Sequence, residues 1–205
     1  MTGNDRGGSV APNDGADQGA ASDAAAARRR ALRTRLIDAR LALSDRVARE
    51  TALRNRVLRW LNTMPLARLA FFWPIRGEPD LAPAITRWLA ADASRRAALP
   101  VVDGEQLQFA PWSPGAAMQP GAFGIPVPHT AARLVPQLLL IPCVGFDGSR
   151  YRLGYGGGYY DRTLASLAVR PVAVGVAFDC ARVPSIEPQP HDIRLDLVIA
   201  ESGVV

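Results

Sequence analysis

Apolar side chains occur in short, nearly continuous runs along the chain, and helical spacing of apolar positions fills much of the sequence between them. A run with little polar interruption is typical of a strand that is buried on both faces of a parallel sheet. Runs of this kind predict strands at residues 69–73, 97–102, 134–141, 171–178 and 195–200, with a shorter one at 106–110. Helices are predicted at residues 26–43, from Ser44 or Asp45 to before Pro65, from Asp80 through Leu89, and at 159–169. Strands that alternate with helices predict a three-layer α/β/α domain with a Rossmann-like, mostly parallel sheet.

Residues 1–26 lack this pattern, because small and polar residues dominate and almost no large apolar side chain is present. Such a segment buries too little surface to offset the entropy of ordering it, which predicts a disordered tail. Residues 27–205 are predicted to form one domain. Within this domain, the proline- and glycine-rich residues 111–128 predict a long loop without regular structure.

Composition limits location and partners more than it limits chemistry. The chain of 205 residues is 48% hydrophobic with a formal net charge of +5, and all 24 basic residues are arginine. That charge permits binding of nucleic acid, ATP or a polyanionic folate equally well. No apolar run reaches the length of a membrane span, and the start lacks the layout of a secretion signal. Cys143 and Cys180 form neither a disulfide framework nor a metal motif, so a cytoplasmic location is expected. The protein is also expected to be a monomer without membrane or nucleic-acid partners.

A glycine-rich segment at residues 151–162, with the sequence YRLGYGGGYYDR, carries the candidate chemistry. It lies between a predicted buried strand and a predicted helix, which is the layout of an anion site. Glycines let backbone N–H groups turn toward a phosphate, and the helix start adds unpaired N–H groups and a positive dipole. Arg152 and Arg162 flank the loop and can add charged donors. The segment lacks the features of a Walker loop and of a dinucleotide fingerprint, and a plain glycine-rich turn is the alternative interpretation.

Asp161 does not suit a bare phosphate site, because a carboxylate beside a phosphate repels it. Two arrangements remove the repulsion. Asp161 can cap the following helix, or it can bind a Mg²⁺ that the phosphates also bind. The residues alone leave both arrangements open.

The sequence RLGYGGGYYD at 152–161, preceded by PCVGFD at 142–147, resembles the motifs RLGxGxGYYD and P-x-x-x-F-D of the 5-formyltetrahydrofolate cyclo-ligases, or methenyltetrahydrofolate synthetases. RRALR at 29–33 resembles the K-x-x-L-R of that family, with Arg29 in place of lysine. The resemblance covers about residues 27–200. It implies a sheet of the sugar-phosphate-isomerase and CoA-transferase type. It also implies ATP-dependent cyclisation of 5-formyltetrahydrofolate to 5,10-methenyltetrahydrofolate, through a phosphorylated formyl (iminium phosphate) intermediate, with release of ADP and phosphate.

The resemblance also implies which residues hold the two substrates. ATP would contact Arg29, Arg33, Arg152, Gly154, Tyr155, Gly156, Gly157, Gly158, Tyr159 and Tyr160. The reduced folate would contact Trp73, Glu78, Phe123, Tyr155 and Tyr159. Glu78 follows Trp73 by five positions, as in the family, and its carboxylate can accept two hydrogen bonds from the aminopyrimidine edge of a pterin. Tyr155 stands where relatives have a basic residue, and its side chain can stack on the substrate or hydrogen-bond to it.

Catalysis is assigned by the same resemblance to Arg152, Tyr159 and Asp161. HDIRLD at 191–196 resembles the family segment H-D-x-x-x-D, whose first aspartate holds Mg²⁺ together with the aspartate after the double tyrosine. Asp161 and Asp192 are therefore the implied ligands of Mg²⁺, which is often bound through carboxylates and substrate phosphates. Two alternatives remain. One is a nucleotide- or CoA-ester-binding protein of similar fold without ligase activity, and the other is a nucleic-acid-binding module that uses the arginine-rich first helix.

Overall fold

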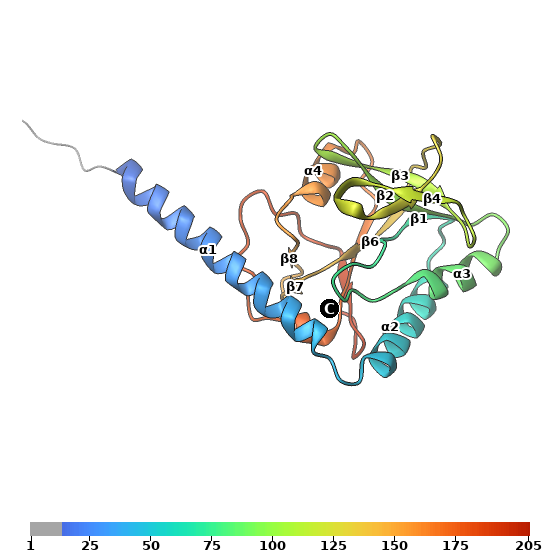
Figure 1. The fold of residues 1–205 in the computed structure, drawn as a ribbon, viewed down its shortest axis with the longest axis horizontal. Helices are drawn as coiled ribbons and strands as arrows, with labels where there is room; N and C mark the ends of the chain where they lie inside the picture. The colour runs from blue at the N-terminus through green and yellow to red at the C-terminus, as the bar shows by residue number, and fades with distance from the viewer. Residues whose placement is uncertain (1–13) are drawn as a thin grey trace, which may run out of the picture.

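The computed structural model of the chain describes residues 14–205 (Figure 1). At its centre lies a six-stranded sheet with the strand order β10-β9-β6-β1-β2-β3. The strands are β1 (Arg68–Ala70), β2 (Arg96–Asp103), β3 (Gln106–Trp112), β6 (Leu138–Pro142), β9 (Val172–Val176) and β10 (Leu197–Ile199). Neighbouring strands from β10 to β2 pair in parallel, and β3 joins the edge antiparallel to β2. The predicted α/β class and the mostly parallel sheet are confirmed.

Helices cover both faces of the sheet. They are α1 (Asp14–Leu41), α2 (Arg46–Leu61), α3 (Ala82–Ala90) and α4 (Tyr159–Ser166). α2 and α3 pack on one face, in a core that includes Leu69 and Leu140. Ala70 follows Leu69, and Leu139 precedes Leu140. Both contribute to the core on the other face, which also includes Leu164 of α4. Because both faces are buried, each strand needs apolar residues at consecutive positions. No helix within residues 14–205 is sufficiently long and apolar to cross a lipid bilayer.

Helix α1 begins at Asp14 rather than near residue 26. Residues 14–26 are therefore helical, whereas the sequence predicted that they belong to a disordered tail. The segment is rich in alanine, which has the highest helix propensity, and it continues a helix whose later turns are packed on the domain. Figure 1 shows the N-terminal part of α1 projecting away from the sheet. Residues 1–13 lie outside the described residues, and the division of the chain at residue 26 stays a prediction.

Residues 111–128 contain short regular elements, so the prediction of an irregular loop is wrong. β3 continues to Trp112, and β4 (Met118–Pro120) pairs antiparallel with β5 (Pro126–Pro128). A 3-10 turn at Ala122–Gly124 lies between the two strands. Proline lacks an N–H group and is accepted in such a two-stranded ribbon, where many backbone groups need no ladder partner.

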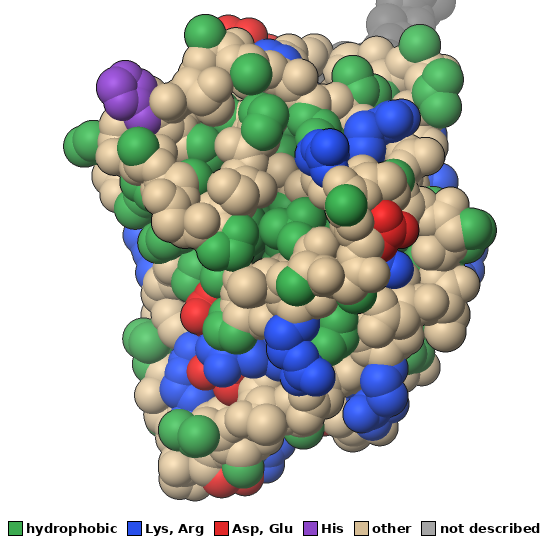
Figure 2. Space-filling model, turned by 90° about the vertical axis from the view of Figure 1, so that its right-hand side faces the viewer, with side chains coloured by type: hydrophobic (Ala, Val, Ile, Leu, Met, Phe, Trp, Pro, Cys, Tyr) green, Lys and Arg blue, Asp and Glu red, His purple; other side chains and the backbone are tan. Residues whose placement is uncertain are grey.

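The arginine-rich surface of α2 is partly neutralised by acids. Figure 2 shows arginine and acidic side chains side by side in the lower part of the face on which α2 and α3 lie. Arg54 contacts both Glu50 and Asp80 at 3.3 Å, and Arg46 lies 4.0 Å from Glu50. These pairs are partly exposed, and they reduce the positive potential that the sequence composition suggests.

Candidate functional site

Three segments that are distant in sequence meet beyond the carboxyl ends of β1 and β6. The first is the loop after β1, at residues 71–81, and the second is the C-terminal half of α1. The third is the ribbon of β7 (Gly145–Phe146) and β8 (Arg152–Leu153), together with the glycine segment that follows it. Leu36 of α1 packs against this ribbon so closely that a Cβ on Gly145 would lie 2.6 Å from its Cδ1 atom. Ligands of open parallel sheets bind at this edge.

The glycine segment has a backbone that most side chains would not permit. Gly156 and Gly158 have φ angles of +97° and +66°, in the region that favours glycine. A Cβ on Gly158 would also lie 2.6 Å from the Arg162 Nη1 atom. Helix α4 begins directly after Gly158, and no side chain caps its first N–H groups. The glycines therefore shape a narrow turn that leads into a helix start, as the sequence predicted for a phosphate site.

Asp161 is not a helix cap, so that alternative from the sequence is wrong. Its Oδ2 atom accepts a hydrogen bond of 3.0 Å from the Arg152 Nη2 atom, and its Oδ1 atom accepts one of 3.0 Å from the backbone N–H of Ile193. Arg152 is only 6% exposed, and its guanidinium group lies 5.7 Å from the centroid of the Tyr160 ring. Asp161 thus connects the glycine segment to the segment that follows Asp192.

Asp192 forms a second, largely buried ion pair, with Arg29 of α1. The Arg29 Nη1 and Nη2 atoms donate to its two carboxylate oxygens over 2.6 and 3.1 Å. The backbone N–H of Gln189 donates to the same carboxylate over 2.7 Å. Burial alone would raise the pKa of Asp192, but the hydrogen bonds from Arg29 and Gln189 outweigh it and lower this pKa. Asp192 is therefore ionised at neutral pH.

Arg33 lies between this ion pair and the glycine segment. Its Nε atom donates a hydrogen bond of 2.8 Å to the carbonyl oxygen of Gly154, and its guanidinium group lies within van der Waals distance of a Cβ placed on Gly156. Burial and the neighbouring charge of Arg29 lower the pKa of Arg33. The structure thus places Arg33 against the glycine segment and Arg29 against Asp192, and their contacts with ATP stay a prediction.

Asp161 and Asp192 satisfy the chemistry of a Mg²⁺ site in donor type. Both are carboxylates. The backbone N–H that donates to Asp161 is that of Ile193, the residue directly after Asp192. Within the part of the chain that the structure describes, no three His, Cys, Asp or Glu side chains gather around one point. Mg²⁺ is commonly held by one or two carboxylates plus substrate phosphates, so two protein ligands are compatible with it.

Glu78 is a buried carboxylate at the end of the loop after β1. Glu78 is only 3% exposed, and its Oε1 atom accepts a hydrogen bond of 2.7 Å from the Tyr155 hydroxyl. The backbone N–H of Ile75 donates to Oε2 over 2.9 Å. Burial raises the pKa of Glu78, and these two hydrogen bonds and the charge of Arg40 act against that rise. Tyr155 therefore binds Glu78 rather than extending alone into solvent.

Arg40 is a site residue that the sequence reasoning missed. It is one of several arginines in the first helix, and it is only 2% exposed. Its Nη2 atom donates 2.8 Å to the Tyr155 hydroxyl oxygen and its Nε atom donates 3.1 Å to the carbonyl oxygen of Arg76. The spacing from Arg29 through Arg33 and Leu36 to Arg40 places all four on one helical face. That spacing was the available signal.

The two aromatic residues implied for the folate differ in their surroundings. Trp73 is half-buried and packs against the core on the α2 and α3 face, so its packing role is clear. Phe123 is 76% exposed, with a φ of +57°. Its ring centroid lies 6.0 Å from that of Tyr159 in an edge-to-face arrangement. The short 3-10 turn thus carries an exposed aromatic side chain to the start of α4.

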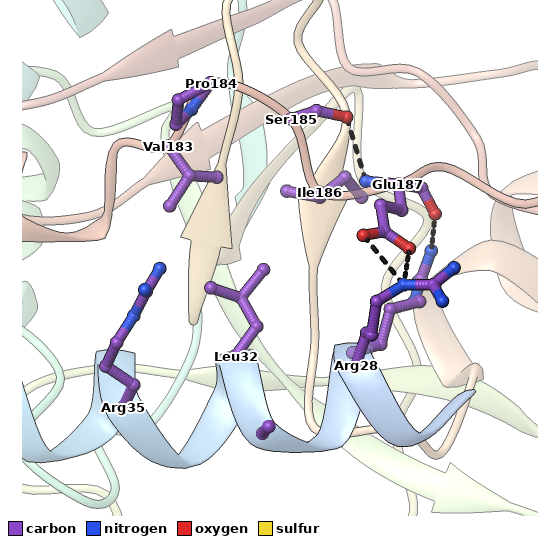
Figure 3. A pocket seen from close by; sticks show the side chains of 10 residues that line it. Arg28, Leu32, Arg35, Val183, Pro184, Ser185, Ile186 and Glu187 are labelled. Carbon is purple, nitrogen blue, oxygen red and sulfur yellow. Dashed lines mark hydrogen bonds and ion pairs between the residues drawn. The ribbon is translucent and has the colours of Figure 1, made fainter. Parts of the chain in front are cut away.

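A groove of about 490 Å³ adjoins this site, between α1 and residues 183–187 (Figure 3). Leu32 faces Val183 and Ile186 across it, and Arg28 and Arg35 flank Leu32 along the helix. The Arg28 Nε atom donates to the Glu187 carboxylate at 2.9 and 3.1 Å, at one end of the groove. Arg29 lines the groove as well, so the groove and the Arg29–Asp192 pair are neighbours.

Comparisons with known proteins agree on one family. The sequence model of the 5-formyltetrahydrofolate cyclo-ligase family matches residues 25–201. The 5-formyltetrahydrofolate cyclo-ligase of Escherichia coli K12 is 34% identical over 146 residues, which cover 66% of this chain and 79% of that protein. A solved 5,10-methenyltetrahydrofolate synthetase from Mycoplasma pneumoniae has a TM-score of 0.68 at 25% identity, covering 83% of this chain and 97% of that one. The Aquifex aeolicus synthetase has a TM-score of 0.70 at 31% identity, covering 86% and 91%.

Proposed function

The chain belongs to the 5-formyltetrahydrofolate cyclo-ligase family, and we propose that it converts 5-formyltetrahydrofolate and ATP into 5,10-methenyltetrahydrofolate, ADP and phosphate. The observation that carries this proposal is the convergence of a positive-φ glycine segment, two arginine–aspartate pairs and a buried glutamate at one edge of the sheet. These groups suit a phosphate donor and a pterin at adjacent positions.

The proposed reaction has two steps. The formyl oxygen attacks the γ-phosphorus of ATP, the bond from that phosphorus to the bridging oxygen breaks, and ADP leaves. N10 of the folate then attacks the formyl carbon and loses its proton, and the carbon–oxygen bond breaks to release phosphate. The protein supplies no nucleophile in this scheme. Its tasks are to align the γ-phosphorus with the formyl oxygen and to stabilise the charge of the phosphates.

On the phosphate side, the arginines and the glycine segment are proposed to bind the phosphates and stabilise their charge. The N–H groups of the segment and the start of α4 are the proposed donors to phosphate oxygens. Arg29 and Arg152 each hold one aspartate in this structure, and phosphate oxygens are alternative acceptors for both guanidinium groups. Asp161 and Asp192 are the proposed holders of a Mg²⁺, which would neutralise phosphate charge when bound. Tyr159, at the first position of α4, is the proposed link between ATP and folate.

On the folate side, Glu78 is the proposed partner of the pterin. Each of its carboxylate oxygens has one protein donor and retains capacity for another hydrogen bond. The aminopyrimidine edge of a pterin offers adjacent N–H groups to such a carboxylate. Phe123 and Tyr159 provide aromatic surface beside it, and Trp73 supports the loop from the core.

The groove beside Arg29 is the proposed position for the nucleoside part of ATP. Its two sides carry apolar residues, Leu32 on α1 and Val183 and Ile186 opposite, and arginines flank Leu32. A purine can bury its faces between such sides and stack on guanidinium groups. Because Arg29 belongs to both the groove and the phosphate side, one nucleotide can extend from the groove to the glycine segment.

The activity itself is the first prediction. Purified protein with ATP, Mg²⁺ and 5-formyltetrahydrofolate should form the methenyl product, followed by its absorbance, and omission of ATP or addition of a chelator should stop product formation. Absence of turnover from protein with a cooperative thermal transition would contradict the proposal. Calorimetric titration with ATP and with coenzyme A would then distinguish a nucleotide-binding protein from a CoA-ester-binding protein.

A second prediction tests the groove. Ala31 is exposed on α1 and lines the groove, so Ala31→Trp should fill it without disturbing the core. The KM for ATP should rise about tenfold or more, equivalent to about 1.4 kcal/mol of lost binding, while the KM for the folate stays unchanged. Ala26→Trp is the matched control, since Ala26 is exposed on the same helix and is not part of the groove. An unchanged KM for ATP in Ala31→Trp would remove the groove from the ATP site.

A further inference from the structure

Arg40, Tyr155 and Glu78 form one chain of hydrogen bonds that crosses three segments of the protein. The Arg40 Nη2 atom donates to the Tyr155 hydroxyl oxygen over 2.8 Å, and that hydroxyl donates to Glu78 Oε1 over 2.7 Å. The three residues come from α1, the glycine segment and the loop after β1. A hydroxyl that accepts from a guanidinium group and donates to a carboxylate is polarised in one direction, which strengthens both bonds.

These hydrogen bonds lie largely in the interior of the protein. Arg40 and Glu78 are both buried, and Tyr155 is half-buried between them. Arg40 is also held by the carbonyl oxygen of Arg76, 3.1 Å away, so its guanidinium orientation is fixed by two acceptors. The Arg76 guanidinium group lies 5.5 Å from the centroid of the Tyr155 ring. The Tyr155 hydroxyl is therefore held between the Arg40 guanidinium group and the Glu78 carboxylate.

The other polar groups near Glu78 do not replace this pair of residues. Arg46 donates to the backbone carbonyl oxygens of Gly77 and Glu78, not to the carboxylate. Burial raises the pKa of Tyr160, and it raises that of Cys143 to about 12, so both groups are neutral at physiological pH. Arg40, acting directly by its charge and through the Tyr155 hydroxyl, is thus the cation that favours an ionised Glu78.

We propose that Arg40 and Tyr155 are positioning residues that keep the Glu78 carboxylate oriented and ionised for the pterin. This inference rests on the proposed function for its substrate, but the state of Glu78 can be measured without turnover. A neutral carboxyl group keeps one proton of its own and cannot accept from two adjacent pterin donors as a carboxylate does. Removal of either positioning residue should therefore weaken folate binding through Glu78.

The variants for the test are Tyr155→Phe, which removes the hydroxyl, and Arg40→Met, which removes the charge. Each should raise the pKa of Glu78 by about one pH unit or more, because an opposing favourable contact is lost while burial remains. The acid limb of kcat/KM for the folate should move to higher pH by the same amount. The KM for the folate at neutral pH should rise about tenfold. In Arg40→Met, the KM for ATP should change little compared with the KM for the folate, and Arg40→Lys should restore part of the pH profile.

Two variants serve as matched controls. Tyr151→Phe removes a tyrosine hydroxyl from the same ribbon and glycine segment, and Arg59→Met removes an exposed charge from α2. Neither should move the pH profile. The direct measurement is a ¹³C NMR titration of the Glu78 carboxyl carbon, assigned with Glu78→Gln, in the wild type and in both variants. If its midpoint is the same in Tyr155→Phe, Arg40→Met and the wild type, the inference is wrong, whether or not the wild type turns over. An inactive wild type with shifted midpoints in the variants would overturn only the proposed function.

Discussion

Asp161→Asn should lower kcat on the order of 100-fold, because it removes a proposed ligand of the Mg²⁺ whose charge would stabilise the phosphoryl transfer. Part of the activity should return at high Mg²⁺ concentration, since the weaker site can then be filled by mass action. Asp192→Asn should behave in the same direction. The measurements are steady-state kinetics at a series of Mg²⁺ concentrations and the binding of Mn²⁺ as a spectroscopic substitute for Mg²⁺.

The structure adds a cost to this substitution. Asp161 is the carboxylate partner of the buried Arg152, and an amide nitrogen facing that guanidinium group cannot replace it. Some loss of thermal stability is therefore expected, on the order of 3 kcal/mol. The kinetic comparison must be made at a temperature where the variant is fully folded, as judged by its thermal transition.

Asp196→Asn is the matched control for both effects. Asp196 also accepts from an arginine, Arg170 at 3.2 Å, and from a backbone N–H, that of Ala173 at 2.7 Å. It directly precedes β10 and lies beside the start of β9, at the opposite end of the parallel strands from the glycine segment. Asp196→Asn should change stability but not the dependence on Mg²⁺. Full activity of Asp161→Asn, with the wild-type dependence on Mg²⁺, would refute the metal role and leave only an anchor for Arg152.

Glu78→Gln should raise the KM for the folate by roughly 10- to 100-fold, because a hydrogen-bonded charge contributes about 1.5–3 kcal/mol. The amide can still accept from the Tyr155 hydroxyl, but it cannot offer acceptors on both sides to the pterin. The KM for ATP should stay within about twofold of its wild-type value. Initial rates measured with each substrate varied in turn separate the two constants.

Glu201→Gln provides the comparison for Glu78→Gln. Its carboxylate is also largely buried and accepts from an arginine, Arg49 at 2.9 Å, and from the backbone N–H of Asp179 at 2.7 Å. It is no part of the proposed site, so its substitution should affect stability without a selective change in the KM for the folate. A Glu78→Gln enzyme that is impaired for ATP and normal for the folate would show that the site is divided differently.

The sequence determined the layers of the fold and the local shape of the glycine segment, for which phosphate binding stays a prediction. Strands buried on both faces need consecutive apolar residues, and this requirement is visible at residues 138–142 and 172–176 without any knowledge of their neighbours. The glycine segment is equally local, since the φ angles of Gly156 and Gly158 restrict those positions to glycine whatever surrounds them. Local pattern failed at residues 14–26 and 111–128. There, helix propensity and a short strand pairing outweighed a composition that suggested no regular structure.

Only the tertiary structure decided which charged groups meet. The hydrogen bonds of Asp161 with Arg152 and with the N–H of Ile193 exclude the helix cap, and the Mg²⁺ role stays a prediction. Arg40 is one of many arginines in the first helix, and its spacing from Arg29 and Arg33 places it on their face of the helix without revealing its partners. Its role depends on a hydroxyl at residue 155 and a carboxylate at residue 78. Such contacts are set by how α1 packs across the carboxyl ends of the strands, and that packing depends on the whole core rather than on any short stretch of sequence.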